Sequence, residues 1–332
     1  MITFDKISND IPWNNFPEFE NFNVFQTHSW HNFLQNNQNA ETIVVSIQEG
    51  DHLLGYFSGL VTRKFGLKML GSPLRGWNTD FMGFFLKNQS SIREILKVFP
   101  NFVFNTLKCH YLEIIDPEIK LRDVEGLPMD FEIQPRFILD LTKNEDELFA
   151  NMKGSCRNLI RQSVRKGVII EETEDFDFLD EYYAQITQVF AKQSLEPPYS
   201  FERVKSLIET MLPTRNILLL QAKGPSGNCI ATGIFVGFNK TVAYWGAASW
   251  REFQSLRPNE ALVWYGIRYW KAKGIKEFHF GGGWEQYKSK YGCEEISVIR
   301  LMKAKYPTLD RLRVILLSLQ SPKFRNWSIR RF

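Results

Sequence analysis

The residue types best suited to chemistry gather in one short stretch, residues 274–292, whose sequence is GIKEFHFGGGWEQYKSKYG. A short alternating strand over residues 276–280 is predicted to end at consecutive glycines, which permit positive φ and the close approach of another group. Two cations and two aromatic rings follow, on a segment with few aliphatic residues to hold it in a core. The residues concerned are Gly281, Gly282, Gly283, Tyr287, Lys288, Lys290 and Tyr291. We interpret the stretch as a strand exit that opens onto a ligand, with a plain tight turn as the alternative.

A second group with binding chemistry is a row of cations on one predicted helix, residues 152–166. Arg157, Arg161 and Arg165 stand four residues apart, which places them on one helical face. Like charges at this spacing repel one another, so such a row indicates an anionic ligand. The alternative is a solvated helix face.

The loop at residues 71–80, GSPLRGWNTD, also combines charged and aromatic groups. It contains two glycines, a proline and the large side chains of Arg75, Trp77 and Asp80. Loops often carry binding residues on a rigid scaffold, so we expect this one to form a wall of a binding site. The alternative is a loop that only turns the chain.

These groups must be positioned by a mixed set of helices and strands. Hydrophobic periodicity predicts, in the first half, a helix entered through Thr27 or Ser29, then a hairpin, a helix and further strands. The second half is predicted to contain helices, a three-stranded meander, a helix that opens at Pro258, and the strand before the glycines. The predicted ranges are residues 42–48, 53–63, 67–70, 91–99, 111–115, 131–140, 168–171, 176–194, 201–211, 217–222, 229–238, 241–247 and 258–273.

Length and composition describe an ordinary globular protein. With 332 residues the chain is longer than one usual domain, so two domains are expected. Hydrophobic residues make up 44% and charged residues 23%, a balance that allows a sizeable core. No apolar run has the length of a membrane span and the start lacks the plan of a signal peptide, so we expect a cytosolic protein.

Metal and thiol chemistry are not indicated. The cysteines lack CxxC spacing, so we expect buried thiols rather than a zinc site, a disulfide or a nucleophile. They are Cys109, Cys156, Cys229 and Cys293. His28 and His31 flank one helical turn without a third ligand nearby, so we interpret them as surface or capping residues.

The charge is distributed unevenly along the chain. Residues 1–140 carry 12 Lys and Arg against 17 Asp and Glu, whereas residues 141–332 carry 29 against 20. Any anionic ligand is therefore expected in the second half.

Residues 140–305 resemble the GNAT acyltransferase fold, in the branch that includes the Fem peptidoglycan-bridge aminoacyltransferases and the BioF2-like acetyltransferase domains. The matching features are the basic helix with its KGV ending, YWGAAS at residues 244–249, RPNEAL at residues 257–262, and the segment from Gly281 to Gly292. The first half resembles the same branch through residues 25–30 and the GSPLRGW loop.

The resemblance implies an α/β fold of the α+β type, with two tandem GNAT-like domains whose mixed, mostly antiparallel sheets are flanked by helices. The expected divisions are residues 1–140 and residues 141–305, followed by a basic helical tail at residues 306–332. In this family the acceptor binds in a cleft and the transfer chemistry belongs to the second unit.

Acyl transfer sets specific demands on the site, because an amine must attack a thioester or ester carbonyl. The site must remove a proton from the amine and stabilise the oxyanion that develops. Lys288 matches the family lysine and is expected to stabilise the oxyanion, with a merely solvated lysine as the alternative. The candidate bases are the carboxylates of Asp80, Glu260 and Glu285. His279 is another candidate, but its place in a predicted strand is more typical of a core residue.

The remaining candidates would bind substrates. Arginines are expected to hold a nucleotide-sugar diphosphate or a tRNA phosphate, and aromatic residues to line a sugar or peptide acceptor. The predicted substrate-binding residues are Arg75, Trp77, Arg157, Arg161, Tyr244, Trp245, Asn259, Gly282, Gly283, Tyr287 and Tyr291.

The acyl donor is left open between acyl-CoA, with acetyl-CoA as the first expectation, and aminoacyl-tRNA. GNAT proteins that use acetyl-CoA usually carry a glycine-rich turn whose N–H groups cradle the pyrophosphate. Residues 253–258 contain no glycine here and end in a proline. Fem-like members, which use aminoacyl-tRNA, also lack the glycine-rich turn. No metal is expected.

Three functions remain as hypotheses. The first is an N-acyltransferase that acylates an amine of a cell-envelope or polysaccharide precursor, such as a nucleotide-sugar or lipid-linked acceptor. The second is a Fem-type transferase that acts on a peptidoglycan precursor, and the third is a non-catalytic GNAT-fold binding protein in polysaccharide assembly. The tail, residues 306–332, carries cations around apolar residues 314–317. This pattern fits packing on the second domain or peripheral contact with the inner face of an anionic membrane.

Overall fold

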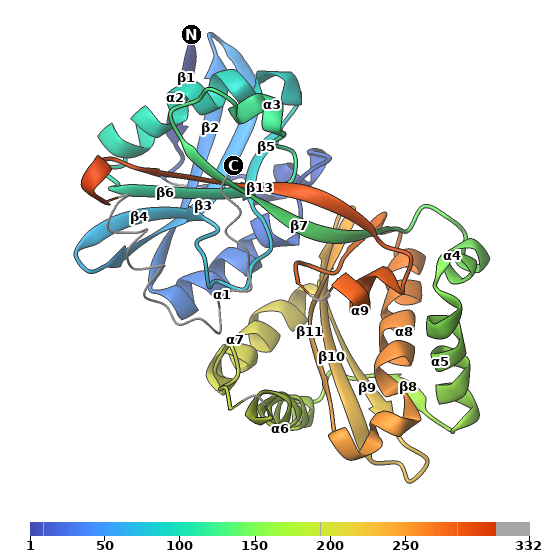
Figure 1. Cartoon of the computed structure of the whole chain (residues 1–332). Helices are drawn as coiled ribbons and strands as arrows, with labels where there is room; N and C mark the ends of the chain where they lie inside the picture. Colours follow the sequence, from blue (N-terminus) through green and yellow to red (C-terminus); the bar gives the residue numbers. More distant parts are fainter. Residues whose placement is uncertain (9, 193, 284, 310–332) are drawn as a thin grey trace. The chain divides into compact units, whose positions relative to one another are not determined.

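The chain forms two compact units, shown in Figure 1. The computed structural model describes residues 1–8, 10–192, 194–283 and 285–309. Unit 1 contains residues 1–135 and the described residues from Ser297 onward, and unit 2 contains Arg136–Ile296. The predicted tail lies outside the described residues beyond Leu309. Within the described ranges, no helix combines the length and apolar character needed to cross a membrane.

Unit 1 is built on a mixed, mostly antiparallel sheet. Its strands lie in the order β1-β2-β3-β4-β6-β13, and β5 also pairs with β3. The pairing of β4 with β6 is parallel, and the other pairings are antiparallel. The strands are β1 (Ile2–Lys6), β2 (Ala40–Glu49), β3 (His52–Lys64), β4 (Leu67–Ser72), β5 (Gly83–Leu86), β6 (Tyr111–Asp116) and β13 (Glu294–Ala304). Strand β13 follows unit 2 in the sequence, yet its residues from Ile299 to Ala304 pair with β6.

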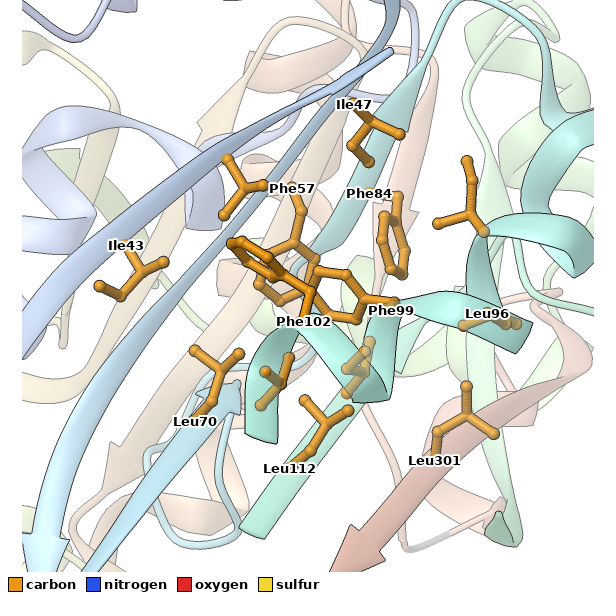
Figure 2. Packing of buried hydrophobic residues seen from close by; sticks show 14 of the residues in the cluster. Ile43, Ile47, Phe57, Leu70, Phe84, Leu96, Phe99, Phe102, Leu112 and Leu301 are labelled. Atoms are coloured by element: carbon orange, nitrogen blue, oxygen red, sulfur yellow. The ribbon is translucent and has the colours of Figure 1, made fainter. Parts of the chain in front are cut away.

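The core of unit 1 lies between this sheet and helix α2 (Ile92–Asn105), and Figure 2 shows its centre. The ring of Phe57 from β3 lies 4.6 Å from that of Phe99 on α2 and 4.9 Å from that of Phe84 on β5, measured between centroids. Leu301 adds a side chain from β13 to the same cluster. Burial of these groups holds together segments that are distant in the sequence.

Helix α1 (His28–Gln38) begins as predicted after Thr27, whose Oγ1 accepts a hydrogen bond from the Trp30 N–H at 3.3 Å. The interpretation of His31 as a surface or capping residue is wrong, because its side chain is fully buried where α1 packs against β2. Its Nδ1 lies 3.2 Å from Thr42 Oγ1. Burial, with a smaller effect of the neighbouring His28, lowers the pKa of His31 to about 3.

Acid is expected to destabilise the protein through His31. The unfolded chain takes up a proton near the ordinary pKa of 6.5, whereas the folded protein resists protonation down to about pH 3. Relative to a His31→Gln variant, the native protein should lose about 1.4 kcal/mol of unfolding free energy per pH unit over that interval. Urea denaturation of both proteins at a series of pH values measures the difference. Parallel pH profiles would contradict it.

In unit 2 the strands lie in the order β7-β12-β11-β10-β9-β8. Strands β11 and β12 are parallel, and the other neighbours are antiparallel. The strands are β7 (Asp130–Asp140), of which unit 2 contains the part from Arg136, and β8 (Ile169–Glu172), β9 (Ile217–Lys223), β10 (Cys229–Phe238), β11 (Thr241–Ser249) and β12 (Glu277–His279). The meander β9-β10-β11 lies where the sequence predicts it.

Helices cover both faces of the unit 2 sheet. Helices α5 (Gly154–Arg165) and α8 (Pro258–Ala272) lie on one side of the meander, and α6 (Asp177–Ala191) and α7 (Phe201–Met211) lie on the other (Figure 1). The short helices are α3 (Leu121–Val124) in unit 1 and α4 (Glu145–Asn151) and α9 (Glu285–Ser289) in unit 2. Mixed, mostly antiparallel sheets flanked by helices confirm the predicted fold class.

Candidate active site

The glycine turn after β12 is a strand exit, as predicted. Gly281 and Gly283 have φ angles of 67° and 73°, in the left-handed region that glycine adopts without a steric penalty. The Gly281 carbonyl accepts a hydrogen bond from the Phe137 N–H at 3.3 Å, which ties the turn to β7. The conformation of the turn therefore requires glycine at these two positions.

Lys288, in helix α9, is only 7% exposed. Its Nζ donates a hydrogen bond to the Gly282 carbonyl and lies 5.7 Å from the centroid of the Phe137 ring. Tyr291, on the same segment, is fully buried. The expectation that this segment stays outside the core is wrong, because a carbonyl and aromatic rings supply the contacts that aliphatic residues would otherwise make.

A largely buried ion pair joins the first turn of α8 to the residues that follow α9. Lys290 Nζ lies 2.6 Å from Glu260 Oε1, and the two side chains are 14% and 12% exposed. The same ammonium lies 4.1 Å from the centroid of the Tyr287 ring and 5.3 Å from that of Tyr291. The predicted base candidate Glu260 is therefore paired with a cation that lies against two aromatic rings.

The tyrosine hydroxyls of this cluster form a hydrogen-bonded chain. Tyr291 donates to the Tyr287 hydroxyl at 3.3 Å, and Tyr287 is hydrogen-bonded in turn to Tyr244 on β11. Burial raises the pKa of Tyr287 to about 12 and the pKa values of Tyr244 and Tyr291 well above the ordinary value. All three hydroxyls therefore keep their protons near neutral pH. The thiol of Cys156, whose pKa burial raises to about 11, also stays protonated, which weakens it as a nucleophile.

Strand β11 changes its pairing beside this cluster. In the described structure its ladder with β12 covers only Thr241–Ala243. The register with β10 shifts between Ile234, which pairs with Gly246, and Phe235, which pairs with Tyr244. Trp245 is therefore the extra residue of a β-bulge, and residues 244–247 are partly exposed. Bulges of this kind redirect side chains and backbone groups and are frequent next to active sites.

Two tyrosines that the sequence analysis missed press against the bulge. The hydroxyls of Tyr182 and Tyr199 are hydrogen-bonded to each other. A Cβ atom at Gly246, in the bulged part of β11, would overlap the Tyr182 hydroxyl. The Tyr199 ring lies 4.6 Å from that of Trp245. Tyr182 lies in α6 and Tyr199 in the loop after it, and nothing in their local sequence indicates a place in the site. The packing of α6 on β11 brings them to the bulge.

The start of α8 is joined to the end of β11. Asn259 Nδ2 donates a hydrogen bond to Ser249 Oγ at 3.1 Å. Arg257, just before the helix, has a φ of 62°, in the left-handed region, and Pro258 occupies the first helical position. Because proline has no N–H, this helix start offers one donor fewer to a bound phosphate.

The predicted arginine row divides into different environments. Arg157 donates through Nη1 to the carbonyls of Ala150 and Met152, at the end of α4. Arg161 is exposed and lies 5.2 Å from the centroid of the Phe149 ring, and Arg165 is exposed as well. Arg157 thus satisfies backbone acceptors, whereas the other two present their charge to solvent.

Other candidates lie elsewhere. Arg75, Trp77 and Asp80 belong to unit 1, where Arg75 forms an exposed ion pair with Glu132 at 2.7 Å, Trp77 is 1% exposed and Asp80 is partly buried. His279 is buried in β12, with Nε2 3.0 Å from Glu277 Oε2, as expected of a core residue. Among the described residues, no group of three or more His, Cys, Asp and Glu side chains could hold a metal ion.

Comparisons with known proteins concern the fold. Residues 150–289 match the family model described as acetyltransferase (GNAT) domain. The chain is similar to the crystal structure of FemX, with a TM-score of 0.75 and 12% identity over 93% of this chain and 99% of that one. A tandem GNAT protein from the clavulanic acid biosynthesis pathway matches with a TM-score of 0.53 and 8% identity, over 92% and 99% of the two chains. The structure of L-PGS from Bacillus licheniformis matches with a TM-score of 0.51 and 12% identity, over 79% of this chain and 85% of that one.

The fold and the family match define the class: this is a GNAT-fold protein, as the sequence resemblance predicts. Within that class, the likeness to FemX extends over nearly all of both chains. At these levels of identity the structural likeness establishes the fold and not a substrate. None of the curated protein sequences compared with the chain matches it significantly.

Proposed function

We propose that the protein is an N-acyltransferase that moves an acyl group from an activated donor to an amine of a cell-envelope or polysaccharide precursor. The observation that supports it most is the bulged edge of β11 from Tyr244 onward, beside the Glu260–Lys290 pair. An open strand edge can hold an extended donor through backbone hydrogen bonds. The adjoining groups supply a carboxylate, buried ammonium groups and protonated hydroxyls.

In the proposed reaction the amine nitrogen attacks the carbonyl carbon of the donor, and Glu260 accepts the proton that the amine releases. Lys288 and the backbone beside the bulge stabilise the oxyanion. The bond from carbon to sulfur or oxygen then breaks, and a tyrosine hydroxyl, with Tyr287 as first choice, protonates the leaving group. The proton on Glu260 restores the tyrosine. Asp80, in unit 1, stays a second candidate for the base.

Acyl-CoA is the donor that the GNAT family match favours. The diphosphate of CoA would need cations as well as helix N–H groups, because Pro258 removes one donor from α8. The exposed Arg161 and Arg165 are proposed to supply that charge. Asn259, Tyr244 and Trp245 are proposed to bind the acyl end of the donor.

Aminoacyl-tRNA is the second candidate donor. It is supported by the proline at the start of α8, by the cationic balance of residues 141–332, and by the likeness to the FemX fold. The acceptor would then be a peptidoglycan precursor, as in the Fem aminoacyltransferases that the sequence resembles. A cytoplasmic protein that touches the inner face of the membrane through residues 306–332 would meet a lipid-linked acceptor there.

Mass spectrometry can test the proposal with acetyl-CoA or a pool of aminoacylated tRNA as donor, and with an amino-bearing UDP-sugar or a lipid-linked muropeptide as acceptor. A mass increase of the acceptor identifies the donor. Binding of tRNA should weaken steeply with added salt, since it depends on phosphate contacts. If neither donor binds or is consumed, the protein is a non-catalytic GNAT-fold binding protein.

Replacement of Glu260 by glutamine is expected to reduce acyl transfer by about 100-fold, because the proton acceptor is lost. It should also lower the free energy of unfolding by about 3 kcal/mol, since Lys290 is left without its carboxylate. Transfer kinetics and urea denaturation measure the two effects.

The matched control is Glu145→Gln, which breaks an exposed ion pair with Arg268 and should change stability by less than about 1 kcal/mol. A second variant, Glu260→Gln with Lys290→Gln, removes both charges and should regain most of the stability without regaining transfer. If the double variant is fully active, Glu260 does not act as the base.

A further inference from the structure

The tip of the β3–β4 hairpin in unit 1 exposes an aromatic ring almost completely. Phe65 is 96% exposed, and together with Gly66 it forms the two-residue loop between Lys64 and Leu67, which pair across the hairpin. The φ angles of Phe65 and Gly66 are 52° and 76°. Positive φ at both loop residues is the type I′ arrangement, for which asparagine followed by glycine is the preferred sequence.

Phenylalanine is a poor residue for this position. A bulky side chain with positive φ is strained by about 1 to 2 kcal/mol, whereas asparagine tolerates the left-handed region. In the turn between β10 and β11 the residue with positive φ is an asparagine, Asn239, at 57°. Phe65 therefore costs stability through its backbone conformation, and its exposed ring gains no stability from burial in return. Strain of this kind is typical of functional positions.

Cations lie at the same end of the sheet as this tip. Arg63 pairs with Lys68 across the hairpin, the Lys68 carbonyl accepts the His110 N–H at 2.7 Å, and the His110 carbonyl accepts the Lys305 N–H at 2.9 Å. This register aligns basic side chains from neighbouring strands at one end of the sheet. The cations of this end are Arg63, Lys64, Lys68, Lys108 and Lys305. In the part of the chain that the structure describes, none of the five forms an ion pair with a carboxylate.

A second exposed ring lies at the same end. Tyr306, directly after Lys305, is 50% exposed. The described chain ends three residues later, at Leu309, so the segment that follows begins at this end of unit 1. By sequence that segment carries Arg311, Arg313, Lys323, Arg325, Arg330 and Arg331. The hairpin tip and the start of the tail thus share one basic, aromatic end of unit 1.

We propose that this end of unit 1, with Phe65 at its tip, docks on an anionic lipid bilayer. The ring of Phe65 enters the interface between headgroups and acyl chains, and Arg63, Lys64 and Lys108 contact anionic headgroups. A bilayer fits better than a nucleic acid, because a ring on a projecting hairpin tip can be buried in a fluid interface, whereas stacking on bases usually uses several rings along a groove. The proposal is independent of the acyltransferase activity.

The test is flotation of the full-length protein with vesicles of phosphatidylcholine alone or mixed with phosphatidylglycerol. Native protein should bind the mixed vesicles, and Phe65→Asn should lower the partition coefficient about tenfold, because the buried ring is lost. Replacement of Arg63 and Lys64 by glutamine should lower it about fivefold for each cation removed. Because asparagine suits the turn, Phe65→Asn should melt at the same temperature as the native protein or higher.

The matched control is Phe176→Asn in unit 2. Phe176 is 52% exposed but stands between Asp175 and Asp177, so its loss should leave vesicle binding unchanged. Equal binding by the native protein and Phe65→Asn would overturn the proposal and assign any binding to the tail. A lower melting temperature of Phe65→Asn would overturn it too, because the ring would then serve the fold. Phe65-dependent binding of tRNA without binding of vesicles would assign the surface to a nucleic acid.

Discussion

Lys288→Met is expected to lower the rate of acyl transfer about 100-fold or more while the protein remains folded. Methionine keeps most of the side-chain volume next to Phe137 but removes the ammonium that is proposed to face the oxyanion. Loss of one preorganised oxyanion donor costs a factor of about 100 to 1,000 in rate. Because this interaction belongs to the transition state, kcat and kcat/KM should fall together. Steady-state kinetics and thermal unfolding measure the effect.

The alternative role of Lys288 is to hold the glycine turn, since its Nζ donates to the Gly282 carbonyl. A matched control is Lys271→Met, which removes an ammonium that donates to the Leu141 carbonyl at 2.8 Å in the same unit. If Lys288→Met melts at a much lower temperature and keeps its rate below that temperature, the lysine supports the turn only. Full activity with an unchanged melting temperature would remove Lys288 from the mechanism.

Arg300→Met is expected to lower the free energy of unfolding by about 3 to 5 kcal/mol, the largest stability effect that we foresee. Arg300 on β13 forms an ion pair with Glu113 on β6, and the two residues are 7% and 5% exposed. The Tyr111 hydroxyl also donates to the Glu113 carboxylate, at 3.1 Å. Without Arg300 the carboxylate stays buried beside a single hydroxyl donor. Urea denaturation at neutral pH measures the loss.

A second variant separates the buried charge from the packing. Arg300→Met combined with Glu113→Leu removes both charges and should regain most of the lost stability. The matched control is Lys97→Met, which breaks an exposed pair with Glu94 and should cost less than about 1 kcal/mol. If the double variant is as unstable as Arg300→Met, the loss comes from the arginine stem and not from the unpaired carboxylate.

Local elements follow from sequence because their periodicity is a property of a few neighbouring residues. The helix predicted at residues 152–166 is α5 (Gly154–Arg165), and the one predicted at residues 258–273 is α8 (Pro258–Ala272). The strand exit at the glycines is likewise confirmed, since positive φ at Gly281 and Gly283 is a local demand. Burial was harder to predict, because it depends on tertiary packing: His31 is covered where α1 packs against β2, and Lys288 lies beside Phe137 of β7.

The members of the candidate site were predictable by type but not as a group. Glu260 is a candidate base from sequence alone. Its partner Lys290 lies 30 residues away, and the sequence shows it only as one of two cations in an aromatic segment. Tyr182 and Tyr199 were missed, because nothing in their local sequence shows that they meet the bulge in β11. The catalytic roles of Lys288, Glu260 and Asp80 stay predictions.

By itself the sequence determined most of the helices and strands, the glycine turn, and the order of elements that identifies a GNAT fold. Only the tertiary structure decided which charges meet, such as Glu260 with Lys290, and that Ile299 to Ala304 of β13 pair with β6. Arg300 and Glu113 lie 187 residues apart, and no local pattern encodes their contact. The physical reason is that periodicity reports which face of an element is apolar, whereas the partner of that face depends on how the whole chain buries its surface.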